Sequence, residues 1–157
     1  MSRRAFVPVF LRFLMAVVLT ALVGTVVQTQ INLAALQAIG VGIPIGVRAS
    51  TTLDDLLRFS PTLAALACVA LAVALPIAGI VQNRFPAQRT FIFIFAGWTS
   101  VLVAFWAANA FAPMPTLIAA TRTLGGAIAV AASGALGAWF FASRRVSEPK
   151  KAVQYVR

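Results

Sequence analysis

Two adjacent aspartates, Asp54 and Asp55, are the residues of this chain best suited to chemistry, and they lie in the stretch TTLDDLLRFSP at 51–61. The whole chain has only one other acidic residue. A carboxylate pair can act as general acid and base, bind a cation, neutralise a buried arginine or begin a helix. Thr52 and Asp55 have the spacing of a capping box with aspartate in place of glutamate, so we predict that a helix starts here.

Arg122 is the second residue with a chemical requirement, because apolar residues flank it within a predicted membrane segment. A charge at that depth costs a few kcal/mol unless it pairs or reaches water. We predict that it joins a polar cluster at the outer ends of the other segments. The alternative is that its side chain extends to the outer headgroups. The candidate members of the cluster are Arg122, Asp54, Asp55, Asn109, Gln28, Gln30 and Asn32.

Residue types that usually bind cofactors and metals are nearly absent from the chain. It contains no histidine and a single cysteine, Cys68. This composition excludes histidine-based haem or zinc ligation, a CxxC redox pair and an intrachain disulfide. We therefore predict no catalytic residue, no metal site and no cofactor, and the sequence favours a protein that is not an enzyme.

The composition is typical of a membrane protein. Of the 157 residues, 61% are hydrophobic and 10% are charged, and the mean hydropathy is +0.95. A soluble domain is about half apolar and about a quarter charged, so this chain lacks the polar surface that water requires. Apolar segments recur along it with the length of about 20 residues that crosses a hydrocarbon core of about 30 Å.

These segments predict an all-α membrane protein, formed as a single domain over residues 1–157, with four transmembrane helices arranged as two hairpins. A longer outer loop, 28–60, should carry short helical segments between the first two spans, since glycines and Pro44 interrupt it. Helical spacing in its first part could continue the first span or form an amphipathic segment along the interface. A basic cytoplasmic tail should cover 143–157. The alternative for the first segment is a signal peptide, which its basic start also suits. The predicted spans are 6–27, 61–81, 91–112 and 116–142.

Basic residues are distributed unevenly between the two predicted sides of the membrane. The side with both termini holds most of them against Glu148 alone, whereas Arg48 and Arg58 balance the two aspartates on the other side. The positive-inside rule therefore predicts that both termini are cytoplasmic, and we expect a bacterial inner membrane. Anionic headgroups are the expected partners of the basic side. Nucleic acid is not expected, because the basic residues are divided among three short segments that flank the membrane.

Small residues on the fourth predicted span indicate close helix packing. Gly125, Ala129, Ser133 and Gly137 recur at four-residue intervals, a pattern that lets helix backbones approach closely in lipid. The contact can be with another span, a second copy or a partner membrane protein. The third span is rich in aromatic residues, which suit a lipid-facing wall or one side of a quinone or acyl-chain groove.

The function that the sequence favours is that of a small polytopic membrane protein, a non-catalytic accessory, scaffold or assembly subunit of a membrane complex. The alternative is a binder of a lipophilic ligand, a quinone or a phospholipid, at the outer side of the bundle. A small transporter fits less well, because no predicted span contains an acidic residue for ion coupling.

Overall fold

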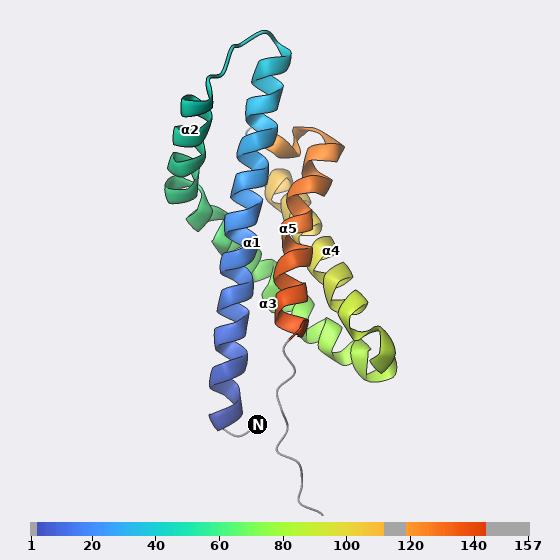
Figure 1. Ribbon diagram of the computed structural model, residues 1–157. Coiled ribbons are helices and arrows are strands. Elements are labelled where there is room, and N and C mark those ends of the chain that lie inside the picture. The colour runs from blue at the N-terminus through green and yellow to red at the C-terminus, as the bar shows by residue number, and fades with distance from the viewer. Residues whose placement is uncertain (1–2, 112–118, 144–157) are drawn as a thin grey trace, which may run out of the picture.

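The computed structural model describes residues 3–111 and 119–143, and 93% of these residues are helical, with no strand among them. Figure 1 shows α1, α3, α4 and α5 packed as a bundle, with α2 beside the upper turns of α1. Two short 3-10 helices, η1 (Pro86–Gln88) and η2 (Ala119–Arg122), precede α4 and α5. The α-helices in these ranges are α1 (Arg3–Ala38), α2 (Ile45–Arg58), α3 (Ser60–Arg84), α4 (Arg89–Phe111) and α5 (Leu124–Ser143).

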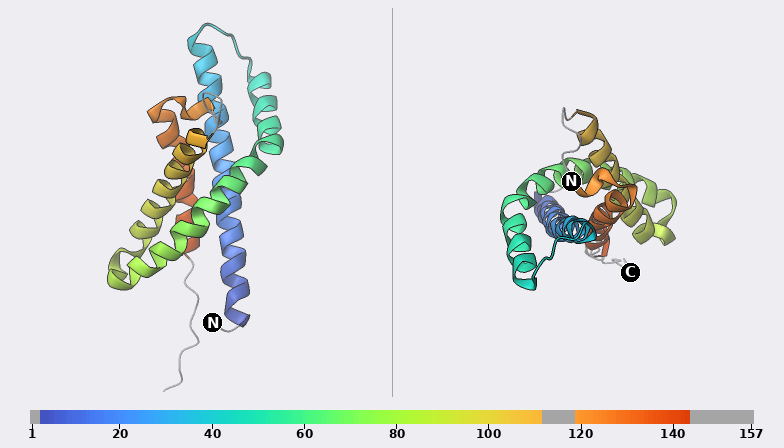
Figure 2. Two further views of the ribbon diagram at one scale, coloured as in Figure 1. Left: turned by 180° about the vertical axis from the view of Figure 1, so that it is seen from behind. Right: turned by 90° about the horizontal axis from the view of Figure 1, so that it is seen from above.

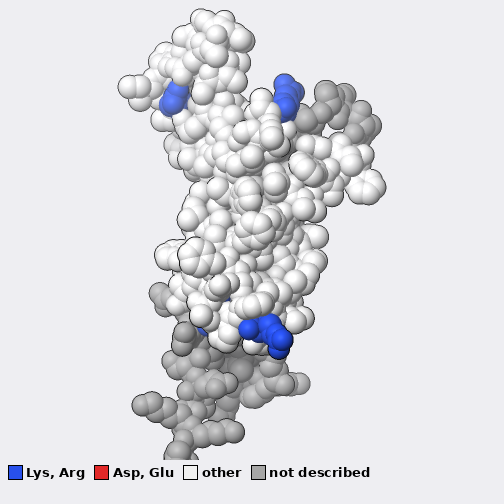
Figure 3. Space-filling model, turned by 90° about the vertical axis from the view of Figure 1, so that its right-hand side faces the viewer, with Lys and Arg blue, Asp and Glu red and all other residues white. Residues whose placement is uncertain are grey.

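Four helical segments within the described ranges are long and apolar enough to cross a membrane, and they coincide with α1, α3, α4 and α5. On the face shown in Figure 3, basic side chains lie toward the two ends and leave an uncharged belt between them. This arrangement confirms the prediction of an all-α protein with four such helices, and it indicates an integral membrane protein.

Helix α1 is longer than the predicted first span, because it continues past residue 27 to Ala38 without a break. At 1.5 Å per residue its 36 residues extend about 54 Å, more than a hydrocarbon core of about 30 Å requires. Its last turns therefore extend beyond the neighbouring helices (Figure 1). The helix ends just before Gly40, whose φ of 88° is the left-handed conformation that commonly terminates a helix.

Helix α2 starts earlier than the sequence predicts. It begins at Ile45, directly after Pro44, so Asp54 and Asp55 lie near its C-terminal end. The predicted capping box is therefore wrong, and the Thr52 hydroxyl instead donates to the carbonyl oxygen of Arg48 inside the helix, at 2.7 Å. Carboxylates at this end face the negative pole of the helix dipole. Their position must be explained by a contact outside α2.

Helix α5 starts at Leu124, and the predicted start of the fourth span at residue 116 lies outside the described residues. Thr123 caps it, because the Gly126 amide donates to Thr123 Oγ1 at 3.1 Å. Arg122 consequently lies in η2, before the helix, and its side chain is exposed. This boundary contradicts the prediction that Arg122 is embedded within the fourth span.

The close packing of α5 depends on glycines that face two neighbouring helices. Gly134 lies against Gly97 of α4, and a Cβ atom on either residue would meet the carbonyl oxygen of the other. Gly137 lies against α1, where an added Cβ would contact the Thr20 hydroxyl and the carbonyl oxygen of Ala16. Close backbone approach of this kind supplies the dispersion contacts that hold helices together in lipid.

The predicted run of small residues turns gradually around α5. Gly125 is exposed with open space around it, Ala129 is half-buried, and Ser133 and Gly137 are buried. A four-residue step advances about 400° around an α-helix, so such a run drifts by about 40° at each step. The first member has therefore left the face that packs on α1, whereas its neighbour Gly126 is buried against Ala120 of η2.

Gly134→Ala should lower the free energy of unfolding by about 1 to 3 kcal/mol, because its methyl group would collide with the Gly97 carbonyl oxygen. Gly125→Ala is the matched control on the same helix, and its methyl group would enter open space. Reversible unfolding in detergent, followed by far-ultraviolet circular dichroism, measures both. Equal stability of the two variants would show that α4 and α5 do not approach through these glycines.

Candidate functional site

Polar side chains join the C-terminal turns of α1 to α2 in a group that we call the polar layer. The amide nitrogen of Gln30 donates to Thr52 Oγ1 at 3.1 Å. Arg48 donates through Nη1 to Gln30 Oε1 at 3.0 Å and through Nη2 to Gln37 Oε1 at 2.7 Å. These contacts link two helices along several turns. The members of the polar layer are Thr29, Gln30 and Gln37 of α1 and Arg48, Thr52 and Asp55 of α2.

The contact of Asp55 with Thr29 explains why a carboxylate stands near the C-terminal end of α2. Thr29 is only 1% exposed, and its hydroxyl lies 2.7 Å from Asp55 Oδ2 and 2.9 Å from the Thr25 carbonyl oxygen. A hydrogen bond to an ionised group contributes about 1.5 to 3 kcal/mol, more than the unfavourable helix-dipole interaction of about 0.3 to 1 kcal/mol. Asp55 therefore fixes α2 against α1.

Buried polar residues continue from the polar layer into the bundle. Ser60, the first residue of α3, donates to Thr25 Oγ1 at 3.2 Å. Gln28 is buried, and its Oε1 has no hydrogen-bond partner among the described residues. A buried carbonyl oxygen without a partner is unfavourable. The interior of the bundle beside α2 therefore contains several buried polar side chains.

The structure divides the residues of the predicted cluster between two places. Gln30 and Asp55 come together in the polar layer, whereas Asp54 is exposed and Asn32 is half-buried. Asn109 of α4 donates instead to Thr121 Oγ1 of η2, at 3.1 Å. Arg122 follows Thr121 directly in η2. A contact between an aspartate and Arg122 stays a prediction.

Sequence reasoning missed four members of the polar layer, Thr29, Gln37, Arg48 and Thr52. A signal for the first of them was present, because polar residues occur at helical spacing along this stretch of α1, at Thr25, Gln28, Thr29 and Asn32. This spacing indicates one polar face on a continuous helix, not a loop. Gln37, Arg48 and Thr52 gave no such signal, since their partners lie on a different helix.

Helix α2 presents an apolar face away from the polar layer. None of its residues is buried, and Leu53 and Leu57 are 62% and 78% exposed. At about 100° per residue, Leu57 lies on the opposite side of the helix from Arg48. Contacts with α1 therefore use the polar face of α2, and Leu53 and Leu57 point away from them.

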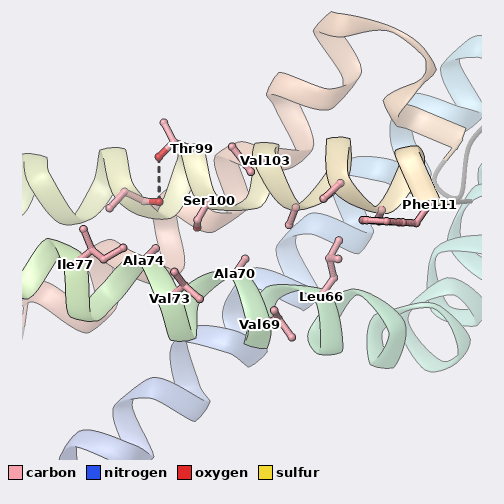
Figure 4. Close-up of a pocket in the computed structure, with 14 residues that line it drawn as sticks. Leu66, Val69, Ala70, Val73, Ala74, Ile77, Thr99, Ser100, Val103 and Phe111 are labelled. Atoms are coloured by element: carbon pink, nitrogen blue, oxygen red, sulfur yellow. Dashed lines mark hydrogen bonds between the residues drawn. The ribbon is translucent and has the colours of Figure 1, made fainter.

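A groove of about 520 Å³ lies between α3 and α4, as Figure 4 shows. Apolar side chains such as Val73 and Val103 form most of its lining. Thr99 and Ser100 supply hydroxyl groups, but these donate within α4, Thr99 to the Phe95 carbonyl oxygen at 2.8 Å and Ser100 to that of Gly97 at 3.0 Å. The groove therefore suits an elongated apolar molecule more than a polar one.

The Thr29–Asp55 contact can be tested by a double-mutant cycle of Thr29→Val with Asp55→Ala, read as unfolding free energy in detergent. We expect a coupling of about 1 kcal/mol or more, because each substitution alone removes the same charged hydrogen bond. In the control cycle, Asp54→Ala takes the place of Asp55→Ala. Because Asp54 is exposed, the effects of the two substitutions should be additive. Additivity in both cycles would contradict the assigned role of Asp55.

No protein-family model, curated protein or solved structure matches this chain. Within 3–111 and 119–143, no three His, Cys, Asp or Glu side chains come together in a group that could hold a metal ion. Four apolar helices are compatible with a small membrane protein, and this architecture occurs with many unrelated functions.

Proposed function

We propose that this chain is a small non-catalytic accessory or scaffold subunit of a membrane complex, and that the apolar face of α2 contacts its partner. The observation that carries the proposal is the orientation of α2. Its polar face is bonded to α1, while Leu53 and Leu57 remain exposed. An exposed apolar face with a polar border is typical of an interaction site.

The fixed orientation of α2 favours a protein partner over a further membrane anchor. Four other helices are already long and apolar enough to cross the bilayer, so one more short amphipathic helix adds little to membrane attachment. Binding of a partner benefits from this fixed orientation, because a helix that is already ordered loses less conformational entropy when it binds. The hydrogen bonds of Asp55 and Arg48 provide that order.

Replacing both outward leucines, Leu53→Gln with Leu57→Gln, should abolish partner retention and leave the thermal stability of the chain in detergent unchanged. Glutamine has a helix propensity close to that of leucine, so the change acts on the surface. The measurement is mild-detergent purification from the native membrane, followed by mass spectrometry of the co-purified polypeptides. Arg58→Gln is the control on α2, since Arg58 is also exposed. The proposal would be refuted if the double variant still retained a stoichiometric polypeptide. It would also be refuted if no polypeptide co-purified with the wild type.

The groove between α3 and α4 supports a second candidate function, binding of a lipophilic ligand such as a quinone. Its apolar lining and its volume of about 520 Å³ are suited to a chain-like molecule. The same purified preparation distinguishes this candidate by mass spectrometry of an organic extract. A stoichiometric quinone in the wild type that is lost in Ala104→Phe, which fills the groove, would favour it, and its absence from the wild type would exclude it.

We further propose that both termini are cytoplasmic and that the protein resides in a bacterial inner membrane, with α1 and α3, and then α4 and α5, crossing as two hairpins. The distribution of charge supports this orientation. Arg12, Arg84 and Arg89 lie at the ends of α1, α3 and α4 that would face the cytoplasm, and both aspartates lie in α2.

Fusion of reporters after Arg157 tests the orientation. A green fluorescent protein should be fluorescent and an alkaline phosphatase inactive, because the first folds in the cytoplasm and the second requires the oxidising side of the membrane for its disulfides. A phosphatase inserted at Gly42, between α1 and α2, is the control and should be active. The reverse pattern would place the basic end outside.

A further inference from the structure

A second groove, which we call the basic-end groove, lies at the opposite end of the bundle from α2. Figure 2 shows that α3 crosses close to α1 and then diverges from it toward this end. The space between them has a volume of about 670 Å³. Its lining is mainly apolar and comes from four helices, with Phe13 of α1, Leu75 and Pro76 of α3, Phe93 of α4 and Phe141 of α5.

Two arginines from different helices line the basic-end groove, Arg12 of α1 and Arg89 of α4, together with the amide of Gln82 from α3. The guanidinium carbon of Arg89 lies 5.8 Å from the centroid of the Phe93 ring, which holds it by a cation–π contact. The Nε atom of Arg89 is buried and has no hydrogen-bond partner among the described residues. The guanidinium group of Arg89 lines the groove and favours an anionic partner, because its hydrogen bonds to charged oxygen atoms are the strongest that it makes.

The described part of the chain offers no carboxylate at this end. Its acidic residues are Asp54 and Asp55, and both belong to α2. Arg84 is the last residue of α3 and adds a further positive charge at this end of the bundle. A guanidinium group binds phosphate oxygens through two parallel hydrogen bonds, which makes arginine well suited to phosphate recognition.

We propose that the basic-end groove binds one acidic phospholipid. Its phosphate accepts hydrogen bonds from Arg89 and Arg12, and one acyl chain lies along the apolar lining between α1 and α3. The two halves of the groove match the two halves of such a molecule, since cationic groups and an apolar surface are continuous in it. This site lies apart from α2 and does not depend on the proposed partner.

The headgroup half of the proposal is tested by titrating the purified full chain with phosphatidylglycerol or phosphatidylcholine in detergent, with native mass spectrometry and thermal shift as readouts. We expect the wild type to prefer phosphatidylglycerol, and Arg89→Gln to weaken its binding about tenfold or more, as expected for loss of a charge-assisted hydrogen bond. Arg84→Gln is the control, because it removes a charge outside the lining, and its affinity should stay within about twofold. Equal affinity of the two variants, or no preference between the lipids, would overturn the proposal.

The acyl-chain half is tested by Gly79→Leu. Gly79 lines the groove, and a Cβ atom there would meet no neighbour within 4 Å, so the leucine side chain would fill the groove without displacing backbone. We expect Gly79→Leu to lose phosphatidylglycerol binding although Arg89 is intact, and inorganic phosphate to give the wild type no thermal stabilisation. Wild-type lipid affinity in Gly79→Leu, or stabilisation by inorganic phosphate alone, would overturn the acyl-chain assignment. If Arg89→Gln does not fold, Arg12→Gln takes its place in the same comparison.

Discussion

The rest of the structure depends on the close approach of helix backbones to α5. Within a bilayer the exclusion of water does not draw apolar helices together, so their association relies on dispersion contacts at short range. Gly134 permits this approach to α4 at Gly97, and Gly137 permits it to α1 at Thr20. Helix α5 therefore positions both neighbours through glycines. The placement of the polar layer on α1 and of the grooves beside α4 depends on these close contacts.

The two ends of the bundle differ in how their polar and charged side chains are bonded. At the end that carries α2, hydroxyl, amide and carboxylate groups bond to one another across α1 and α2, so the helices are joined by directional bonds such as Thr29 to Asp55. At the basic end, arginines gather beside apolar surface without a described carboxylate. The side chains of the polar layer bond to one another within the chain, although the neighbouring Gln28 Oε1 has no partner among the described residues. At the basic end the Nε of Arg89 has none either.

Composition was enough to predict four apolar helices, because their length and lack of charge are set by the bilayer. Helix ends were harder to predict. Thr51 and Thr52 resembled a helix start, yet α2 begins at Ile45, directly after Pro44, and α5 begins at Leu124, after Thr123. Gln30 and Asp55 were expected in a polar cluster, but the bond of Asp55 to Thr29 spans 26 residues and could not be read from local spacing. The helical spacing of polar residues in α1 was the one available signal for Thr29, and the predicted first span ended at residue 27, before it.

The unbroken course of α1 has a mechanical consequence. One continuous helix carries Arg12 in its first half and Gln37 near its other end, and no proline lies between them to kink it. Close to its midpoint, Ala16 and Thr20 lie directly against Gly137 of α5, and this short-range contact is the pivot of α1. A sideways load applied to α2 would therefore rock α1 about that pivot and change the spacing between α1 and α3 on the far side of the bilayer.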